Sequence, residues 1–377
     1  MSLDLHLQAL EHTPLTGLVR RVLGDDSMDV AAWDATQIHG GGGAASSGVY
    51  RVAGTGHAAA GTRPWSLVLK VLRAPAAGTT FASIPVEGWD REVSTYRSGL
   101  LDDLPTGLAA PRCFAIGEQP GFVWLWLEDV TDEVGPRWPI ARFAQAARHL
   151  GRLNGAYLGA RPLPAYPWLQ RNMLRWRAEG NVAFWAGFDG VRDTPEMRQS
   201  WPDPLGDRAL RLWHERHGLL DRLDRLPQTL VHGDADRRNL FARRGAEGDE
   251  TVAIDWAFTG VAALGEELVN LVTASALWFQ VEVTDLADLA DQCLEGYVSG
   301  LTDVGWRGDP RLARVGFVVA AALRYGPFIA AQVARIGPER FAQLMGHPAE
   351  DVLACWAAVR RFAFDRLDAA RGLIEAL

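Results

Sequence analysis

The feature that most constrains the fold of this chain is a change in the spacing of its apolar residues near Pro136. Before this point, segments such as 66–73 (SLVLKVLR) alternate between two faces, as the residues of a β-strand do. After it, segments such as 140–158 repeat apolar residues at helical spacing, which is typical of amphipathic helices. We therefore predict an α+β fold with a small β-rich N-terminal lobe, residues 1–127, and a large, mostly helical C-terminal lobe, residues 128–377.

Composition narrows the class of protein. The 377 residues are 48% hydrophobic and 22% charged, which excludes a disordered chain, a collagen and a coiled coil. Acidic residues outnumber basic ones in both lobes and the net charge is −8, so nucleic acid is not an expected partner. We expect no membrane span and no secretory signal, because apolar stretches are short and the N-terminus carries acids. Three scattered cysteines suit a reducing compartment, so we expect a cytoplasmic protein.

Lysine usage points to a functional position. Lys70 is the only lysine among 38 basic residues, and all the others are arginine. On the predicted strand it shares a face with Val68 and Leu72, a half-buried position where lysine is unusual unless it is paired. Drift is one explanation; the functional one is that this position requires a compact ammonium rather than a guanidinium. Because Leu69 precedes it, Lys70 does not belong to a P-loop.

The segment 231–256, VHGDADRRNLFARRGAEGDETVAIDW, carries the most chemistry. Asp234 lies five positions before Asn239, and Asp255 ends the apolar strand pattern VAID. Phosphoryl transfer requires a carboxylate that orients the attacking hydroxyl, together with oxygen ligands for Mg²⁺. Each piece alone fits an ordinary turn or core strand. Their order behind a glycine-rich loop, a strand lysine and a helical glutamate favours phosphoryl transfer.

The string Asp234-Ala235-Asp236 permits two other interpretations, a glycosyltransferase metal site and a phosphatase with an aspartyl nucleophile. The phosphatase pattern requires an apolar strand immediately before the first Asp and Thr or Val four residues after it. Here His232 and Gly233 precede it, and Arg238 stands at the later position. Phosphoryl transfer from a nucleotide therefore remains the favoured interpretation.

These motifs resemble those of the aminoglycoside phosphotransferase and choline kinase group, which shares a protein-kinase-like fold of two lobes. The pattern HGDxxxxN matches residues 232–239, and the metal motif IDW matches residues 254–256. The helix motif usually written LGxLH is similar to residues 150–154, with Asn154 in place of the histidine. The resemblance covers about residues 30–300 and implies an ATP-dependent kinase, using Mg²⁺, of a small-molecule hydroxyl.

Carried over residue by residue, the resemblance implies the phosphate-handling roles. Asp234 is the catalytic base, and Asn239 and Asp255 hold the magnesium ions. Lys70 contacts the α- and β-phosphates and is held by Glu92. His232 holds the catalytic loop rather than acting in the chemistry.

The resemblance also implies how the rest of the nucleotide binds. Trp126 and Glu128, in the hinge-like segment 124–130 (WLWLEDV), present backbone groups to adenine. The glycine loop 40–43, with Gly41, Gly42 and Gly43, lies over the phosphates, although its spacing departs from GxGxxG.

The acceptor is expected to carry an amine, as an aminoglycoside-like antibiotic or an amino sugar does. Glu266 and Glu267 follow the metal motif closely, in a predicted helix, and either could recognise such an amine. Stabilisation of the helix N-terminus by acidic residues explains them equally well. Two alternatives stay open: a kinase of a neutral sugar or other primary metabolite, and a non-catalytic nucleotide-binding regulator with the same fold.

Overall fold

The structure is a computed structural model that describes residues 12–39, 46–74, 80–81, 84–85, 88–119, 121–246, 248–328 and 338–376. The predicted phosphate loop, with Gly41, Gly42 and Gly43, lies outside the described residues. The chain divides into two compact units. One comprises Met1–Phe81, Pro85–Asp102 and Ala110–Thr131, and the other Ala82–Ile84, Asp103–Ala109 and Asp132–Leu377. The predicted division at residues 127 and 128 into lobes of different function stays a prediction.

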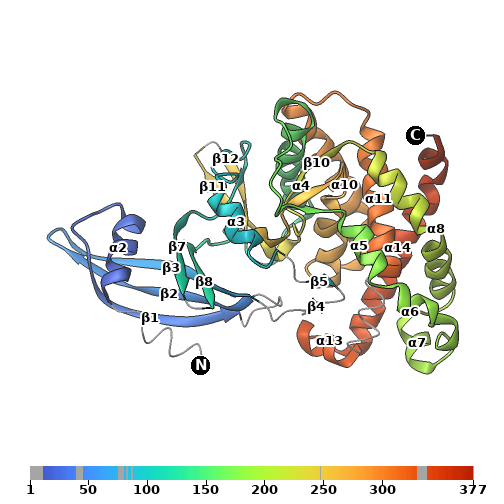
Figure 1. Cartoon of the computed structure of the whole chain (residues 1–377), viewed down its shortest axis with the longest axis horizontal. Helices are drawn as coiled ribbons and strands as arrows, with labels where there is room; N and C mark the ends of the chain where they lie inside the picture. The colour runs from blue at the N-terminus through green and yellow to red at the C-terminus, as the bar shows by residue number, and fades with distance from the viewer. Residues whose placement is uncertain are drawn as a thin grey trace. The chain divides into compact units, whose positions relative to one another are not determined.

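The N-terminal unit is built on a five-stranded sheet with the order β1-β2-β3-β8-β7, in which every neighbouring pair is antiparallel (Figure 1). Its strands are β1 Asp29–His39, β2 Ser46–Ala58, β3 Gly61–Arg73, β7 Cys113–Gln119 and β8 Phe122–Glu128. The two short strands β4 Thr80–Phe81 and β5 Ile84–Pro85 pair separately.

The two faces of this sheet pack against different helices. Leu67 and Leu69 of β3 are buried with Leu15 of helix α2, His12–Leu23. Leu72 is buried on the other face with Val93 of helix α3, Arg91–Arg97. Because side chains alternate along a strand, Lys70 lies on the same face as Leu72 and therefore on the side of α3.

Helix α3 is shorter than the helical pattern over residues 88–104 predicts. It ends at Arg97, and turns follow up to Asp103. Gly99 adopts a φ of 72°, a left-handed conformation that glycine takes without a steric penalty and that ends a helix. Leu100 and Leu101, whose spacing fits a helix, therefore lie in the turns that follow α3.

The C-terminal unit contains two small sheets and most of the helices (Figure 1). One sheet joins β10 Gln228–Val231, β13 Gly260–Ala263 and β9 Gln170–Arg171; the other joins β11 Leu240–Gly245, β12 Gly248–Ala253 and β6 Leu108–Ala109. The α-helices are α4 Ile140–Gly155, α5 Met173–Glu179, α6 Val182–Ala186, α7 Pro195–Ser200, α8 Leu205–Arg225, α9 Ser275–Leu277, α10 Leu286–Asp303, α11 Pro310–Leu323, α13 Pro338–Met345 and α14 Ala349–Ala376. The β-then-helical organisation predicted from the sequence is confirmed.

Helices α4 and α10 approach each other closely because glycines line their contact. A Cβ atom on Gly300 would overlap the carbonyl oxygen of Arg148, and one on Gly151 would overlap that of Tyr297. The predicted helix over 140–158 forms as α4 and continues as a π-helical turn, Ala156–Ala160. This pair of helices supports the strand that leads into the catalytic loop, since Asn154 of α4 donates a 2.8 Å hydrogen bond to the carbonyl of Leu230.

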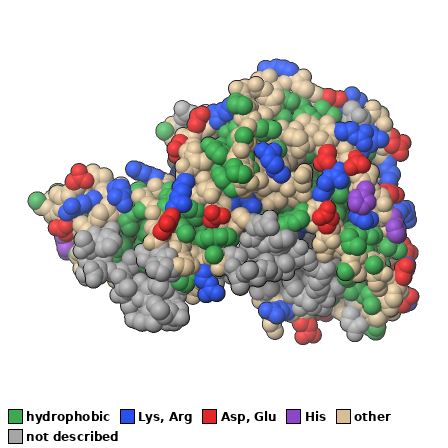
Figure 2. All heavy atoms as spheres, viewed as in Figure 1, with side chains coloured by type: hydrophobic (Ala, Val, Ile, Leu, Met, Phe, Trp, Pro, Cys, Tyr) green, Lys and Arg blue, Asp and Glu red, His purple; other side chains and the backbone are tan. Residues whose placement is uncertain are grey.

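No helix in the described part of the chain has the length and apolar character needed to cross a membrane. Acidic and basic side chains are intermixed over the surface shown in Figure 2.

Candidate active site

The predicted catalytic loop connects β10 to β11 and is shaped by Gly233. This residue has a φ of 83°, and a Cβ atom there would overlap the carbonyl oxygen of Phe258. Any other residue would therefore be strained at this position and would push away the segment that follows Asp255. The loop thus brings Asp234 beside the end of the VAID strand because glycine permits both the turn and the close approach.

Two asparagine side chains fix the carboxylate of Asp234. Asn239 Nδ2 donates to Asp234 Oδ2 at 3.1 Å and to the Asp234 carbonyl at 2.8 Å. Asn270 Nδ2 donates to Asp234 Oδ1 at 3.0 Å. With each carboxylate oxygen accepting one hydrogen bond, the orientation of Asp234 is set before any ligand arrives.

The electrostatic environment of Asp234 suits a group that accepts a proton. Burial raises the pKa of this half-buried carboxyl to about 7, and the negative charge of Asp236 acts in the same direction. The positive charge of Arg324 acts in the opposite direction. A catalytic base is most effective when its pKa lies near the working pH.

The candidate metal ligands Asn239 and Asp255 also gather at this loop. The backbone N–H of Ile254 donates to the Asn239 carbonyl at 2.9 Å, which places the residue before Asp255 next to Asn239. Asp255 has a left-handed backbone with φ 61° and ψ 64°, an unusual conformation for a residue other than glycine and one that often marks functional sites.

The donors present fit a magnesium ion bound together with phosphates. In the described part of the chain, no group of three or more His, Cys, Asp or Glu side chains is arranged to hold a metal. Mg²⁺ at a phosphoryl-transfer site needs fewer protein ligands, because phosphate oxygens and water supply the rest. One carboxylate and one amide oxygen are hard donors of the kind that Mg²⁺ prefers.

His232 and Glu267 hold the catalytic loop from behind. His232 Nδ1 accepts a 3.2 Å hydrogen bond from the N–H of Asp234, so the other ring nitrogen, Nε2, donates to the Ile254 carbonyl at 2.9 Å. The Glu267 carboxylate accepts from the N–H groups of His232, at 2.7 Å, and Gly233, at 3.1 Å. The carboxylate of Glu267 is therefore committed to the loop and is not presented to a ligand.

In the N-terminal unit, Lys70 and Glu92 form an ion pair. Lys70 Nζ lies 2.5 Å from Glu92 Oε2, and only 12% of the lysine side chain and 1% of the glutamate side chain are exposed. The lysine comes from β3 and the glutamate from the first turn of α3, which covers that face of the sheet. A buried carboxylate of this kind fixes the position of an ammonium group.

The backbone of Trp126 is less suited to binding adenine than the sequence suggests. Trp126 pairs with Leu69 of β3 on one side and with Ala115 of β7 on the other, so it lies inside the sheet. The N–H of Glu128 donates to the Arg112 carbonyl at 2.9 Å. The adenine contacts of Trp126 and Glu128 stay a prediction, and backbone donors for adenine must be sought after Glu128.

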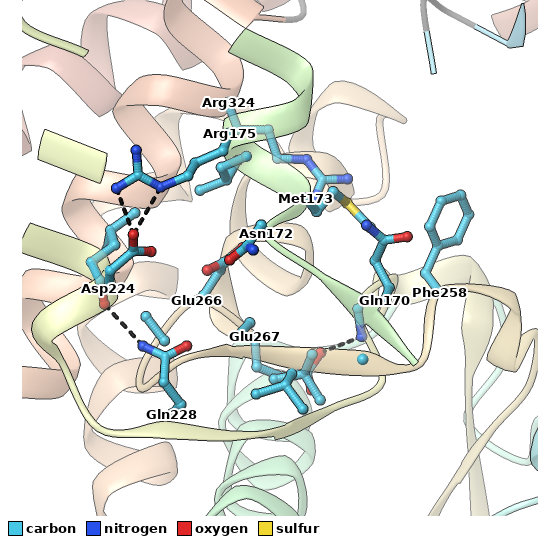
Figure 3. A pocket seen from close by; sticks show the side chains of 18 of the residues that line it. Gln170, Asn172, Met173, Arg175, Asp224, Gln228, Phe258, Glu266, Glu267 and Arg324 are labelled. Atoms are coloured by element: carbon cyan, nitrogen blue, oxygen red, sulfur yellow. Dashed lines mark hydrogen bonds and ion pairs between the residues drawn. The ribbon is translucent and has the colours of Figure 1, made fainter. Parts of the chain in front are cut away.

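A pocket in the C-terminal unit lies next to the catalytic loop, since Gly233 and Asn270 are part of its wall. Figure 3 shows its polar side chains, which come from β9, α5, α8, β10, the segment after β13 and the π-helical turn after α11. The charged residues on the wall are Arg175, Asp224, Glu266, Glu267 and Arg324. Glu266 is half-buried, and burial raises the pKa of its carboxyl to about 7.

Sequence reasoning missed Asn270 and Arg324. Each begins a π-helical turn, Asn270–Ala274 and Arg324–Phe328, which rotates side chains away from the regular helical pattern. Tyr325 links the two turns, because its hydroxyl donates to Asn270 Oδ1 at 3.1 Å. The only sequence signal for Asn270 is the rarity of asparagine in this chain, and Pro327 is the only signal for the second turn.

A five-stranded sheet with helix α3, a loop that carries Asp234, Asn239 and Asp255, and an adjacent pocket are the features expected of a small-molecule kinase. A family model described as the phosphotransferase enzyme family (APH) matches residues 91–307, more than half of the chain. The chain therefore belongs to this family of small-molecule phosphotransferases, whose kinases use ATP with a divalent cation. The resemblance inferred from the motifs is confirmed. No curated protein matches the chain.

Solved structures share the fold at low sequence identity. Choline kinase from Cryptosporidium parvum Iowa II is 11% identical with a TM-score of 0.54, covering 96% of this chain and 97% of that one. A microcompartment-associated aminopropanol kinase is 13% identical with a TM-score of 0.53, covering 94% and 98%. Amicoumacin kinase, in complex with AMP-PNP, Ca²⁺ and its ligand, is 14% identical with a TM-score of 0.51, covering 97% and 96%. At these identities the likeness shows the fold alone.

Proposed function

We propose that this protein transfers the γ-phosphoryl group of ATP, bound with Mg²⁺, to a hydroxyl group of an amine-bearing small molecule. The observation that carries the proposal is the carboxylate of Asp234, fixed by Asn239 and Asn270 beside a pocket that contains Glu266. A carboxylate held in this way orients an acceptor hydroxyl for in-line attack.

In the proposed reaction the acceptor oxygen forms a bond to the γ-phosphorus while the bond between that phosphorus and the β,γ-bridging oxygen breaks. The hydroxyl proton passes to Asp234, and ADP leaves. The raised pKa of Asp234 supports its role as the proton acceptor. No phosphoenzyme is needed, because donor and acceptor are bound together.

The proposed nucleotide contacts are those that the sequence motifs imply. Lys70, positioned by Glu92, contacts the α- and β-phosphates, and Asn239 and Asp255 hold the magnesium. When bound, the metal neutralises charge on the phosphate oxygens and orients them. The glycine loop with Gly41, Gly42 and Gly43 completes the phosphate contacts in this proposal. The three free cysteines suit the reducing cytoplasm in which we place the protein.

Glu266 supports an amine on the acceptor. Its side chain accepts a hydrogen bond from the backbone of Ala263 but makes no ion pair with a described residue, and it lines the same wall as Asn270, which contacts Asp234. A protonated amine would pair with this carboxylate and lower its raised pKa. Choline and aminopropanol, named for two proteins with this fold, each carry a cationic nitrogen and a hydroxyl.

A screen for ADP formation tests the proposal. Aminoglycosides, amino sugars, amino alcohols and choline would be compared with neutral sugars and nucleosides, using wild type and Glu266→Gln. We expect turnover with an amine-bearing acceptor and a loss of about tenfold or more in kcat/KM in the variant. Equal turnover of a neutral sugar and its amino derivative, unchanged by Glu266→Gln, would favour the alternative of a neutral-sugar kinase.

A further inference from the structure

The charged residues on the pocket wall differ in whether they have a partner of opposite charge or a hydrogen bond to the catalytic loop. Arg175 pairs with Asp224, at 2.5 Å, and with Asp221, at 2.6 Å. Glu267 accepts hydrogen bonds from the catalytic loop. Glu266 and Arg324 remain, with opposite charges, and neither makes an ion pair with a described residue, although Glu266 accepts a hydrogen bond from the backbone of Ala263. They do not pair with each other, although the charge of Arg324 lowers the pKa of Glu266.

Arg324 is held away from the ion pair on the same wall. In Figure 3, Arg175 turns toward Asp224, whereas Arg324 extends in the opposite direction. Its Nε is buried and lacks a hydrogen-bond partner in the part of the chain that the structure describes. The residues that follow its π-helical turn, 329–337, contain no Asp or Glu in the sequence. A guanidinium in this position can bind an oxyanion, because its terminal nitrogens make no hydrogen bond or ion pair with a described residue.

A second guanidinium, that of Arg177, lies close enough to Arg324 for their charges to interact. Arg177 of α5 is 9% exposed, its Nε has no hydrogen-bond partner, and its guanidinium makes no ion pair with a described residue. Burial, followed by the positive charge of Arg324, lowers the pKa of Arg177 to about 9, so Arg177 remains charged at neutral pH. Asp234 and Glu266 are the carboxylates whose charges also reach it. Two neighbouring cations without a bonded carboxylate form an environment that attracts an anion.

We propose that the acceptor is a zwitterion, whose carboxylate or phosphate group binds Arg324 while its amine binds Glu266. The inference rests on the proposed function, because it describes the acceptor of the same site. The planar guanidinium binds an oxyanion through two parallel hydrogen bonds, and Arg177 strengthens the local positive potential. The acceptor brings one charge of each sign to a wall that has one unpaired charge of each sign. A carboxylate is the favoured group, since it matches a single guanidinium fork.

Matched pairs of compounds test the inference. L-Homoserine would be compared with 3-aminopropan-1-ol and L-threonine with 1-aminopropan-2-ol, because each pair differs only in the carboxylate. Ethanolamine phosphate and 3-aminopropyl phosphate, which carry no carboxylate, serve as the phosphate-bearing probes in the binding measurement alone, because their hydroxyl groups are already esterified. Binding is measured by calorimetry, and turnover by ADP formation, in wild type, Arg324→Gln, Arg324→Lys and Arg175→Gln. Arg175→Gln is the matched control, because it removes a guanidinium that already has carboxylate partners.

We expect wild type to bind the acid of at least one pair about tenfold or more tightly than its decarboxylated partner. Arg324→Gln should abolish that preference, Arg324→Lys should retain part of it, and Arg175→Gln should leave the ratio unchanged. Preference for the phosphate-bearing probes alone would identify phosphate as the oxyanion. Thermal melting of each variant confirms that it is folded.

Three outcomes would overturn the inference. One is equal binding of acid and decarboxylated partner in every pair, with no preference for the phosphate probes. Another is a preference that Arg324→Gln leaves intact. The third is an Arg324→Gln variant that weakens MgATP binding and all acceptors by the same factor, which would place Arg324 on the γ-phosphate. If an acid binds through Arg324 but no ADP forms, the proposed function fails and the inference stands. If only acceptors without an acid group are phosphorylated, the proposed function stands and the inference fails.

Discussion

The carboxylate of Glu267 accepts a 2.7 Å hydrogen bond from the backbone N–H of His232 and so ties the segment after β13 to the catalytic loop. The adjacent Glu266 lines the pocket, makes no ion pair with a described residue, and accepts a hydrogen bond from the backbone of Ala263 rather than from the catalytic loop. Two adjacent glutamate residues thus have different roles. One fixes the loop that carries Asp234, and the other is available to a ligand.

Glu267→Gln should therefore reduce stability more than Glu266→Gln does. A glutamine offers one oxygen where two N–H groups, of His232 and Gly233, require acceptors, and its amide group would face one of them. We expect Glu267→Gln to lower the free energy of unfolding by about 1–3 kcal/mol. Urea denaturation of both variants measures this. Equal stability of the two variants would show that Glu267 does not hold the loop.

Lys70→Arg should impair nucleotide binding without unfolding the protein. The longer, planar guanidinium cannot keep the 2.5 Å contact with Glu92 and also present a compact charge to the phosphates. We expect a loss of about tenfold or more in MgATP affinity or kcat, with a nearly unchanged melting temperature. Arg97→Lys, in the exposed ion pair of Arg97 and Glu118, is the control and should have no effect. Full activity of Lys70→Arg would remove the argument from the lone lysine.

His149 should make the protein less stable at mildly acidic pH. This buried side chain forms a 2.9 Å hydrogen bond with Thr251, and burial, followed by the charge of Arg142, lowers its pKa to about 3. Below pH ~6.5 the unfolded chain takes up a proton that the folded chain cannot hold, so stability falls as the pH drops toward 3. Above pH ~6.5 this contribution is constant.

We expect His149→Gln to remove about 2 kcal/mol of the stability lost between pH 7.5 and pH 5. Urea denaturation of wild type and variant at both pH values provides the comparison. An identical pH dependence in the two proteins would mean that His149 is protonated in the folded state.

Asp255→Asn should weaken MgATP binding, because the residue holds the metal through its charge. The left-handed backbone at Asp255 also tolerates asparagine, so the substitution should not disturb the fold. Calorimetric titration should give an increase in Kd of about tenfold or more, and little difference when the metal is omitted. Unchanged MgATP affinity would remove Asp255 from the metal site.

Local patterns were sufficient to predict several elements and the family of small-molecule phosphotransferases. The period-2 spacing around Lys70 and the apolar repeat of 140–158 each depend on neighbours within a few residues, and both elements form. The motif from His232 to Asp255 is local as well, and its loop and strand are recovered. The end of α3 at Arg97 was not predicted, because Gly99 stops the helix within an apolar spacing that continues. The helix expected at Glu266 and Glu267 was wrong, because residues 260–263 form β13 and both glutamates lie in the turn that follows it.

Contacts between segments far apart in the chain could not be predicted from the sequence. Asn270 and Arg324 reach the site through π-helical turns, and a helical spacing does not reveal where such a turn occurs. The commitment of Glu267 to the loop depends on Gly233, more than thirty residues earlier, whose φ of 83° turns the N–H groups toward it. The acceptor pocket is therefore the part of the site that needed the structure.

Transfer of labelled phosphate from γ-labelled ATP to an acceptor, by wild type and Asp234→Asn, tests the central claim most directly. The account predicts a labelled phosphate ester with wild type and none with Asp234→Asn. The variant should still bind MgATP within about threefold of wild type, because Asp234 orients the acceptor and not the nucleotide. Transfer by Asp234→Asn at a wild-type rate, or a wild-type protein that labels no acceptor in the panel, would contradict it.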